Sequence, residues 1–289
     1  MSKCPICNHS SNKIIWNHSI RSGKNAWTKS KIKILRCDNC EVGYLKKRNK
    51  NLKNNKIFRK IYDGDNSIKK YISFNKPREI KKLNFIKKFI KINKMNVLES
   101  NCGAGAILDE LKKTNKITAG VDHKIYENHL KKNNHVFFKN FKSITNIKFD
   151  VILSLAEIEH QYNPILFVEE LIKVLKPNGK IIFRIPNYNN IYYYFLKSKF
   201  QIYDFRTSHN FYFSEKSADF LFQKLKLKIL VKTGIQEYSI NHFLQFLKSL
   251  KRVDSKFEKL INKKNDALIM KNIEENFLST SMLYILQKN

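Results

Sequence analysis

The chain has 289 residues and a mass of 34.3 kDa, enough for one large domain or two modest ones with a buried core. A hydrophobic content of 42% excludes a wholly disordered chain, and eight Gly with five Pro exclude collagen-like or low-complexity character. Apolar runs stay short of the roughly 20 residues that span a bilayer, and the N-terminal segment lacks the apolar region of a signal peptide. We therefore expect a cytoplasmic protein without a membrane span.

The charge is strongly positive, because 56 Lys and Arg oppose 24 Asp and Glu and give a net charge of +32. Such a charge favours an anionic partner. Only eight of the 56 are Arg, which nucleic-acid-binding proteins use for bidentate contacts, and Lys occurs beside abundant Asn and Ile, as AT-rich codons would give. The charge therefore indicates anionic partners in general, phosphates included, and is no proof of RNA binding.

Four of the five cysteines lie in the first 40 residues, as two Cys-x-x-Cys pairs. In a cytosolic protein this pattern is typical of a tetrahedral zinc site. The predicted ligands are Cys4, Cys7, Cys37 and Cys40. The 29 residues between the pairs exceed the gap of the commonest zinc ribbon, so His9 or His18 remains an alternative to one thiol. Because four protein ligands leave no open position, the zinc is predicted to be structural.

The pattern of the sequence divides the chain into three parts. We predict a zinc-binding module over 1–45, a Lys/Asn-rich linker or lid over 46–76, and a main domain with a C-terminal helical extension over 77–289. Within the module, alternating apolar residues predict a hairpin. In the third part, Pro77 and an apolar stripe predict a helix over 77–93.

Beyond residue 95, short apolar runs alternate with stretches of helical character. The runs cover residues 96–99, 117–122, 136–138, 149–155 and 180–185, and the main helical stretches cover 107–113 and 165–175. This alternation predicts an α/β fold, with a doubly wound, mostly parallel sheet covered on both faces. A final run over 282–287 is expected to return as an edge strand.

The segment 96–106 has the pattern of a buried strand that ends in Glu99, a glycine turn and a helix. Gly103 and Gly105 allow a ligand to approach the backbone and the amides of the helix N-terminus. Asp122 ends the next strand, where a carboxylate can hold both hydroxyls of a ribose. Spacing alone does not separate a nicotinamide cofactor from S-adenosylmethionine. The third glycine of the dinucleotide fingerprint is absent, however, and a strand-end Glu suits an ammonium group better than a pyrophosphate.

At these residues the chain resembles the class I S-adenosylmethionine-dependent methyltransferases. Residues 99–105 are similar to their first motif, and Gly-Val-Asp at 120–122 is similar to their second. The segment Ser-His-Asn-Phe-Tyr-Phe-Ser at 208–214 resembles sugar-modifying members, which also carry N-terminal Cys-x-x-Cys pairs. The resemblance covers most of residues 1–232 and implies a Rossmann-like sheet. It implies cofactor-binding roles for Glu99, Ser100, Asn101, Cys102, Gly103, Gly105, Asp122, Asn140 and Leu155.

Two positions depart from the pattern of the family. Asn101 replaces its first loop glycine, and binding is expected to survive because Asn tolerates left-handed backbone angles better than most residues. Asn140 stands where the family usually has an Asp for the adenine amino group, and its amide oxygen can accept the same hydrogen bond. Cys102 is predicted to be a small buried filler rather than a nucleophile.

The resemblance implies direct displacement, in which an acceptor lone pair attacks the methyl group of a sulfonium. The protein then aligns the reactants, excludes water and removes a proton. His160, just past the fourth strand, is the first candidate for the general base, and the alternative is that it only holds the loop of Glu159. His209 is the second candidate, and its alternative is a packed loop residue.

The stretch 190–200 is aromatic and basic. Its helical spacing favours an amphipathic helix on the sheet over a cover for a sugar ring in which Lys197 or Lys199 holds a phosphate. The segment after about residue 235 gives no functional signal.

The functional hypothesis is methyl transfer to a small phosphorylated acceptor, such as a nucleotide-linked sugar or another building block of a surface polysaccharide. The second choice is an RNA base methyltransferase with an N-terminal zinc ribbon, although the chain lacks an Asn/Asp-Pro-Pro-Tyr motif and is poor in Arg. A third is a non-catalytic adaptor whose zinc module binds a partner. The sequence predicts neither the oligomeric state nor the atom that receives the methyl group.

Overall fold

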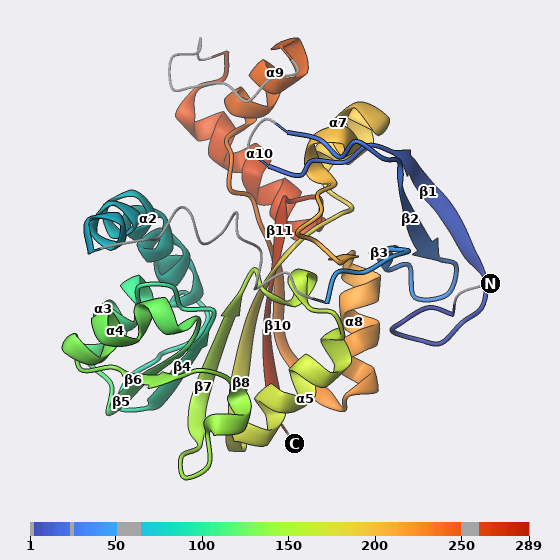
Figure 1. The fold of residues 1–289 in the computed structure, drawn as a ribbon. Coiled ribbons are helices and arrows are strands. Elements are labelled where there is room, and N and C mark those ends of the chain that lie inside the picture. The colour runs from blue at the N-terminus through green and yellow to red at the C-terminus, as the bar shows by residue number, and fades with distance from the viewer. Residues whose placement is uncertain (1–2, 24–25, 51–64, 250–259, 289) are drawn as a thin grey trace.

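A seven-stranded sheet forms the centre of the molecule in the computed structural model (Figure 1). The structure describes residues 3–23, 26–50, 65–249 and 260–288. The strand order is β10-β11-β8-β7-β4-β5-β6, and the neighbouring pairs are parallel except the two that involve β11. This confirms the predicted doubly wound, mostly parallel α/β fold. The strands are β4 (Asn96–Ser100), β5 (Ile117–Val121), β6 (Val136–Phe138), β7 (Phe149–Leu155), β8 (Leu175–Pro186), β10 (Leu227–Ile235) and β11 (Ser281–Lys288).

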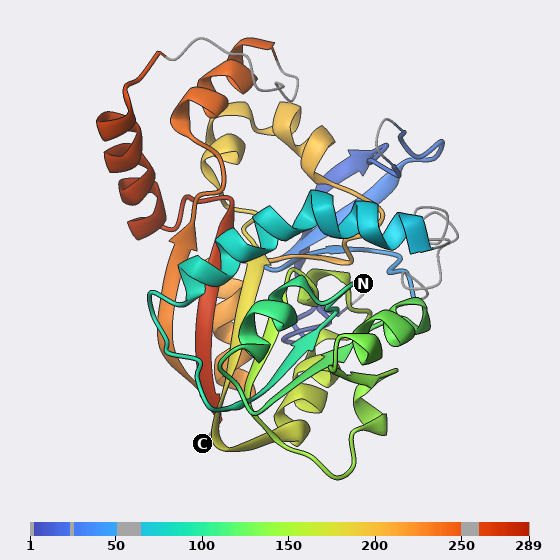
Figure 2. The same cartoon turned by 90° about the vertical axis from the view of Figure 1, so that its left-hand side faces the viewer.

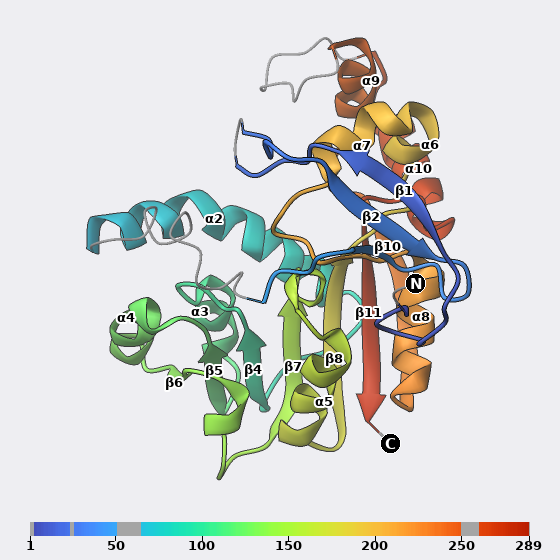
Figure 3. The same cartoon turned by 45° about the vertical axis from the view of Figure 1, so that its right-hand side comes forward.

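Helices cover both faces of this sheet (Figures 1 and 3). Successive side chains of a strand point to opposite faces, so Val97 packs with residues of α2 and α3, whereas Leu98 packs with residues of α5 and α8. Burial on both faces explains why the central strands contain apolar runs such as Val-Ile-Leu at 151–153 instead of strict alternation with polar residues. The helices on these faces are α2 (Asp65–Ile86), α3 (Ala106–Lys112), α4 (Glu127–Lys132), α5 (Pro164–Val174) and α8 (Glu215–Lys224).

The C-terminal strand β11 lies inside the sheet. It pairs antiparallel with β8 on one side and with β10 on the other, so β10 is the edge strand. The strand predicted over 282–287 therefore forms, but its predicted edge position is wrong. Side chains from Ser281 to Leu286 are all buried, which is the burial of an interior strand covered on two faces.

Helix α2 begins twelve residues before the predicted start at Pro77 and ends at Ile86, well short of residue 93. Pro77 lies inside it, although proline usually weakens a helix interior. Ile68 and Ile72 of the early turns pack against the apolar cluster of α3 and α4, and this tertiary contact outweighs the local signal. Figure 2 shows the cyan helix α2 next to the green helices α3 and α4. Residues 65–76 of the predicted linker or lid are thus helical, and the part of it over 51–64 lies outside the described residues.

The N-terminal module forms a second sheet with the order β1-β2-β3-β9. Its predicted hairpin is confirmed as β1 (Asn12–His18) and β2 (Ile32–Cys37). The last module strand, β3 (Gly43–Leu45), pairs antiparallel with β9 (Phe211–Tyr212) of the catalytic part. A strand far along the chain therefore completes the sheet of the module, and the predicted boundaries of the three parts stay a prediction.

The stretch 190–200 is helical, as its spacing predicts, but its predicted place on the main sheet is wrong, since its aromatic side chains pack on the helix over 240–249 and on the N-terminal module. It forms α6 (Ile191–Leu196) and the start of α7 (Ser198–Asp204). Tyr192 of α6 packs on Phe243 and Phe246 of α9 (Ile240–Ser249), which precedes α10 (Lys263–Glu275). Among the described residues, no helix combines the length and the apolar character that crossing a membrane requires. Short helical turns are η2 (Lys124–Tyr126), η3 (Phe141–Ser143) and η4 (Ile158–His160).

Candidate functional site

The loop between β4 and α3 is built from residues with left-handed backbone angles. The φ angles of Asn101, Gly103 and Gly105 are 55°, 54° and 79°. The left-handed conformation expected for Asn101 is therefore present. At Gly105 a Cβ atom would also lie only 2.7 Å from Cδ2 of Leu130. The loop thus passes so close to α4 that a side chain there would displace its neighbour.

Asp122 lies directly beside this loop. Its carboxylate oxygen Oδ2 accepts a hydrogen bond from the backbone N–H of Gly103 at 2.6 Å. The backbone N–H of Asn101 donates to the carbonyl oxygen of Val121 at 2.8 Å, which ties the ends of β4 and β5 together. Because β4 and β5 are parallel neighbours, their carboxyl ends meet at one edge of the sheet. The glycine turn and Asp122 therefore form one site.

Glu99, the next-to-last residue of β4, is buried with an exposed fraction of 5%. Within the described residues, its Oε2 atom has no hydrogen-bond partner. Burial, and secondly the charge of Glu79, raise the pKa of Glu99 well above its usual range. A buried carboxyl group that lacks a partner is costly to the fold and suits a cationic group of a ligand. The residues present therefore fit a cofactor that carries an ammonium group.

The other predicted cofactor residues have different surroundings. Cys102 is buried, and a Cβ atom at Gly120 would lie 2.4 Å from its Sγ atom, so the thiol fills the space that this glycine leaves. Burial raises the pKa of the Cys102 thiol well above its usual range, which keeps it protonated and unreactive. Asn140 is exposed after β6, and its Oδ1 atom accepts the N–H of Ser143. Leu155 ends β7 at the same edge of the sheet.

The two candidate bases lie against each other. The ring centroids of His160 and His209 are 4.8 Å apart, in an edge-to-face arrangement. Nδ1 of His160 shares a hydrogen bond with the carbonyl oxygen of Ser208. A carbonyl oxygen only accepts, so Nδ1 carries the proton and Nε2 is left as an acceptor. Burial, and secondly the charge of Arg206, lower the pKa of His209 well below its usual range, so its ring stays neutral.

A buried carboxylate accompanies these rings. Nε2 of His160 lies 3.9 Å from Oε1 of Glu159, whose side chain is 2% exposed. The side chains of Glu159, His160 and His209 bring their ligand atoms within 4.8 Å of one another, a spacing that also admits a metal ion. Two imidazoles beside a buried carboxyl group also suit proton transfer, and we interpret the cluster in this sense.

The four N-terminal cysteines come together as predicted. The Sγ atoms of Cys4 and Cys40 are 3.6 Å apart, and those of Cys7 and Cys37 are 3.4 Å apart. These separations are too long for a disulfide bond and close to the roughly 3.8 Å between sulfurs that share one tetrahedral zinc ion. Neither of the alternative histidines belongs to the cluster that the described residues form.

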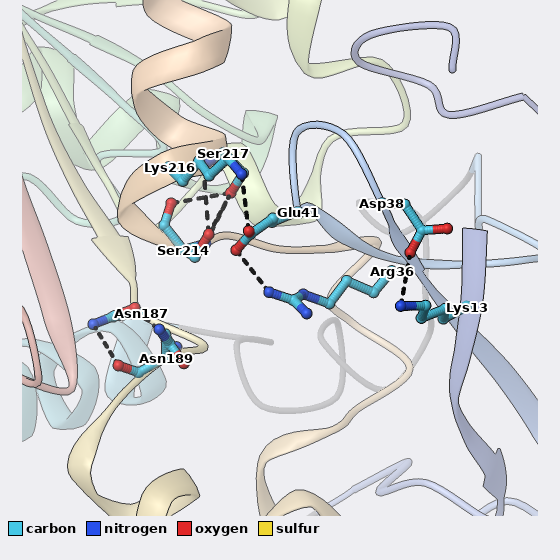
Figure 4. A network of polar contacts seen from close by, with 9 residues as sticks. All are labelled: Lys13, Arg36, Asp38, Glu41, Asn187, Asn189, Ser214, Lys216 and Ser217. Atoms are coloured by element: carbon cyan, nitrogen blue, oxygen red, sulfur yellow. Dashed lines mark hydrogen bonds and ion pairs between the residues drawn. The ribbon is translucent and has the colours of Figure 1, made fainter. Parts of the chain in front are cut away.

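The cysteine cluster is fixed to the catalytic part of the chain. Cys4, Cys37 and Cys40 are buried in the same apolar core as Phe211 and Phe222. Figure 4 shows how Glu41, next to the second Cys pair, lies between Arg36 of β2 and Lys216 of α8. Burial and both cations act on this carboxyl group, and the net effect is a lowered pKa of Glu41. The module is thus held by shared core as well as by ion pairs.

Sequence reasoning missed two polar elements at this edge of the sheet. Arg184 of β8 is 8% exposed and forms an ion pair with Glu237, which follows β10. Asn210 is fully buried, and its side chain makes hydrogen bonds to two other segments, at Asn49 and at residues 160–161. The signal for Asn210 was available in the segment 208–214, whereas the partner of Arg184 lies 53 residues away in the chain and has no motif.

Comparison with known proteins agrees with this geometry. Residues 71–231, more than half of the chain, match the family described as the methyltransferase domain. The chain belongs to this family. Together with the fold, this confirms the predicted enzyme class, an S-adenosylmethionine-dependent methyltransferase.

Individual relatives are distant. The methyltransferase is 29% identical over 114 residues to the mitochondrial ubiquinone biosynthesis O-methyltransferase of Dictyostelium discoideum, a match that covers 32% of this chain and only 36% of that protein. A chain in the complex between the Haloferax volcanii Trm112 methyltransferase activator and a methyltransferase is 14% identical, with a TM-score of 0.51 over 77% of this chain and 94% of that one. A SAM-dependent methyltransferase from Archaeoglobus fulgidus is 18% identical, with a TM-score of 0.48 over 75% and 99%.

Proposed function

We propose that this methyltransferase transfers a methyl group to a small phosphorylated acceptor, such as a nucleotide-linked sugar for a surface polysaccharide, in the cytoplasm. One observation carries the cofactor site: the glycine turn, Asp122 and the buried Glu99, whose Oε2 has no partner among the described residues, lie together at the carboxyl edge of the sheet. The similarity of residues 208–214 to sugar-modifying methyltransferases and the net charge of +32 support an anionic sugar acceptor.

The residues of the site then have distinct tasks. S-adenosylmethionine, when bound, supplies a methyl group already activated on a sulfonium. Glu99 would hold its ammonium group, and Asp122 its ribose hydroxyls. The amide oxygen of Asn140 would accept a hydrogen bond from the adenine amino group, and the backbone amides at the start of α3 would face the cofactor. His160 removes the proton of the acceptor through Nε2, because Nδ1 is occupied by Ser208. His209, buried and neutral, shields that proton from water.

We further propose that the cysteine cluster binds one zinc ion. Four thiolates complete a tetrahedral shell and leave no position for an acceptor, so the ion stabilises the module and takes no part in chemistry. Because the cysteine cluster lies in the core shared with the catalytic part, loss of the zinc ion should also destabilise the catalytic part.

Calorimetry tests the cofactor site. S-adenosylhomocysteine should bind to the wild type, and Asp122→Ala should weaken binding by about 100-fold, because two hydroxyl contacts and the Gly103 bond are lost. Asp150→Ala is the matched control, since Asp150 pairs with Lys176 at the opposite edge of the sheet. Absence of binding to the wild type would favour a non-catalytic adaptor.

Mass spectrometry tests the acceptor. Incubation with nucleotide-linked sugars should add 14 Da (about one methylene) to one of them, and His160→Ala should lower turnover by about 100-fold while S-adenosylhomocysteine binds as before. His209→Ala is expected to have the smaller effect. Methylation of rRNA or tRNA, with an affinity that falls steeply with salt, would instead establish the RNA alternative.

A further inference from the structure

Asn210 joins three segments of the chain through one buried side chain. Its exposed fraction is 0%. The Nδ2 group donates toward the carbonyl oxygens of Asn49 at 3.0 Å, His160 at 3.1 Å and Gln161 at 3.3 Å. The Oδ1 atom accepts the backbone N–H of Asn49 at 2.8 Å. Both ends of the amide are therefore used, and a replacement side chain would leave buried backbone groups without partners.

The backbone of Asn210 extends the same connection. Its N–H donates to the carbonyl oxygen of Glu159 at 2.8 Å, and its carbonyl accepts the N–H of Leu45 at 3.0 Å. Leu45 is the last residue of β3, which carries the pairing between the cysteine module and β9. Arg48 adds a cation–π contact, with its guanidinium 5.0 Å from the ring centroid of Tyr162. The segment 45–49 is thus docked on the loop 159–162.

The same segment holds the ring of His160. The carbonyl oxygen of Ser208, two residues before Asn210, accepts the hydrogen bond from Nδ1–H of His160. The side chain of Asn210 donates to the carbonyl oxygens of His160 and Gln161. Ring and backbone of the candidate base are therefore fixed from one short stretch of chain. A shift of the loop would break the Nδ1 bond and let the proton move to Nε2, which would remove the base.

We propose that Asn210 is a positioning residue: it keeps His160 in the Nδ1–H tautomer, with Nε2 available as the base, and it couples this state to the end of the cysteine module. The catalytic meaning rests on the proposed function of His160. The tautomer itself does not, since it is a property of the protein without any acceptor.

The test is NMR of the full chain with ¹⁵N-labelled histidine, in which His160→Ala assigns the His160 signal. The wild type should show mainly the Nδ1–H tautomer of His160, and Asn210→Ala should lower the ratio of Nδ1–H to Nε2–H by about tenfold, as for a ring without a fixed partner. Asn115→Ala is the matched control, because the Asn115 amide bonds three backbone groups at the opposite edge of the sheet, against four for the Asn210 amide. An unchanged tautomer in a folded Asn210→Ala protein would overturn the proposal.

A second measurement covers a variant that fails to fold. Hydrogen exchange on the wild type should show a strongly protected N–H of Asn49, which donates to Oδ1 of Asn210. Exchange at the rate of an exposed amide would contradict the proposed coupling through Asn210. Neither readout needs methyl transfer. Failure of S-adenosylhomocysteine binding would therefore contradict the proposed function without changing the result on the His160 tautomer. With an acceptor in hand, Asn210→Asp should lower kcat by at least about tenfold and leave KM for S-adenosylmethionine within about threefold.

Discussion

The cofactor side and the base side of this site are assembled in opposite ways. On the cofactor side, the bond between Gly103 and Asp122 joins residues 19 apart in the chain, within one β–α–β unit. On the base side, His160 is held by Ser208 from 48 residues away, and Asn49 meets Asn210 across 161 residues. The bond that defines the first side is therefore local, whereas the bonds of the second exist only once distant parts of the fold have docked.

This difference has a functional consequence. The proposed cofactor site should tolerate changes in the N-terminal module, because the contact between Gly103 and Asp122 does not involve it. The base side depends on β3, on β9 and on the cysteine cluster that supports them. Variants should therefore separate cofactor binding from the state of the base.

Removal of a cysteine ligand should give the largest effect. Cys37→Ser is expected to abolish binding of the proposed zinc ion, lower Tm by about 5 °C or more, and disturb the His160 tautomer, because the shared core would lose the support of that ion. Metal analysis, calorimetry and histidine NMR measure these outcomes, with Cys102→Ala as a control that keeps the metal. The affinity for S-adenosylhomocysteine should stay within about threefold. A tenfold loss of affinity would show that the two sides are not independent.

Gly120→Ala should destabilise the packing around the proposed cofactor site and leave the surroundings of His160 unchanged. The new Cβ would lie 2.4 Å from Sγ of Cys102, and we expect a loss of about 2 kcal/mol in the free energy of unfolding. Cys102→Ala removes the obstructing sulfur, so the double variant should recover more than half of that loss in urea unfolding. Strict additivity of the two single variants would contradict this packing.

Glu99→Gln should make the free protein more stable at neutral pH. Burial raises the pKa of Glu99 in the folded state above its unfolded value, so the folded state binds more protons and stability falls as pH rises through the range above the unfolded pKa. Gln carries no such charge, so its Tm should exceed that of the wild type by a few degrees at pH 8 and differ less at pH 5. The same change should weaken S-adenosylhomocysteine binding. Equal Tm values of variant and wild type at both pH values would show that Glu99 is not strained.

Asn101→Gly should have the smallest effect, within about 0.5 kcal/mol of the wild-type stability. Its φ of 55° is available to both residues, and the lower strain of Gly is offset by its greater freedom in the unfolded chain. Urea unfolding and calorimetry with S-adenosylhomocysteine provide the check. A large change in either would mean that the Asn101 side chain contacts the cofactor.

Local pattern predicted much of this molecule. The strands β6 and β7 have the predicted bounds, and the glycine turn with Asp122 forms as expected, because each depends on residues close together in the chain. The four cysteines also converge as predicted, since each Cys-x-x-Cys turn already directs two sulfurs to one point.

By itself, then, the sequence determined the α/β alternation, the cysteine cluster and the glycine turn beside Asp122, since periodicity and short spacing encode them. Only the tertiary structure decided that α2 runs through Pro77, that β11 lies inside the sheet, and that the Asn210 side chain donates a hydrogen bond to the backbone of the candidate base. Each of these depends on burial against partners distant in the chain. A residue's own neighbours in sequence carry no record of those partners, so packing of the whole fold supplies them.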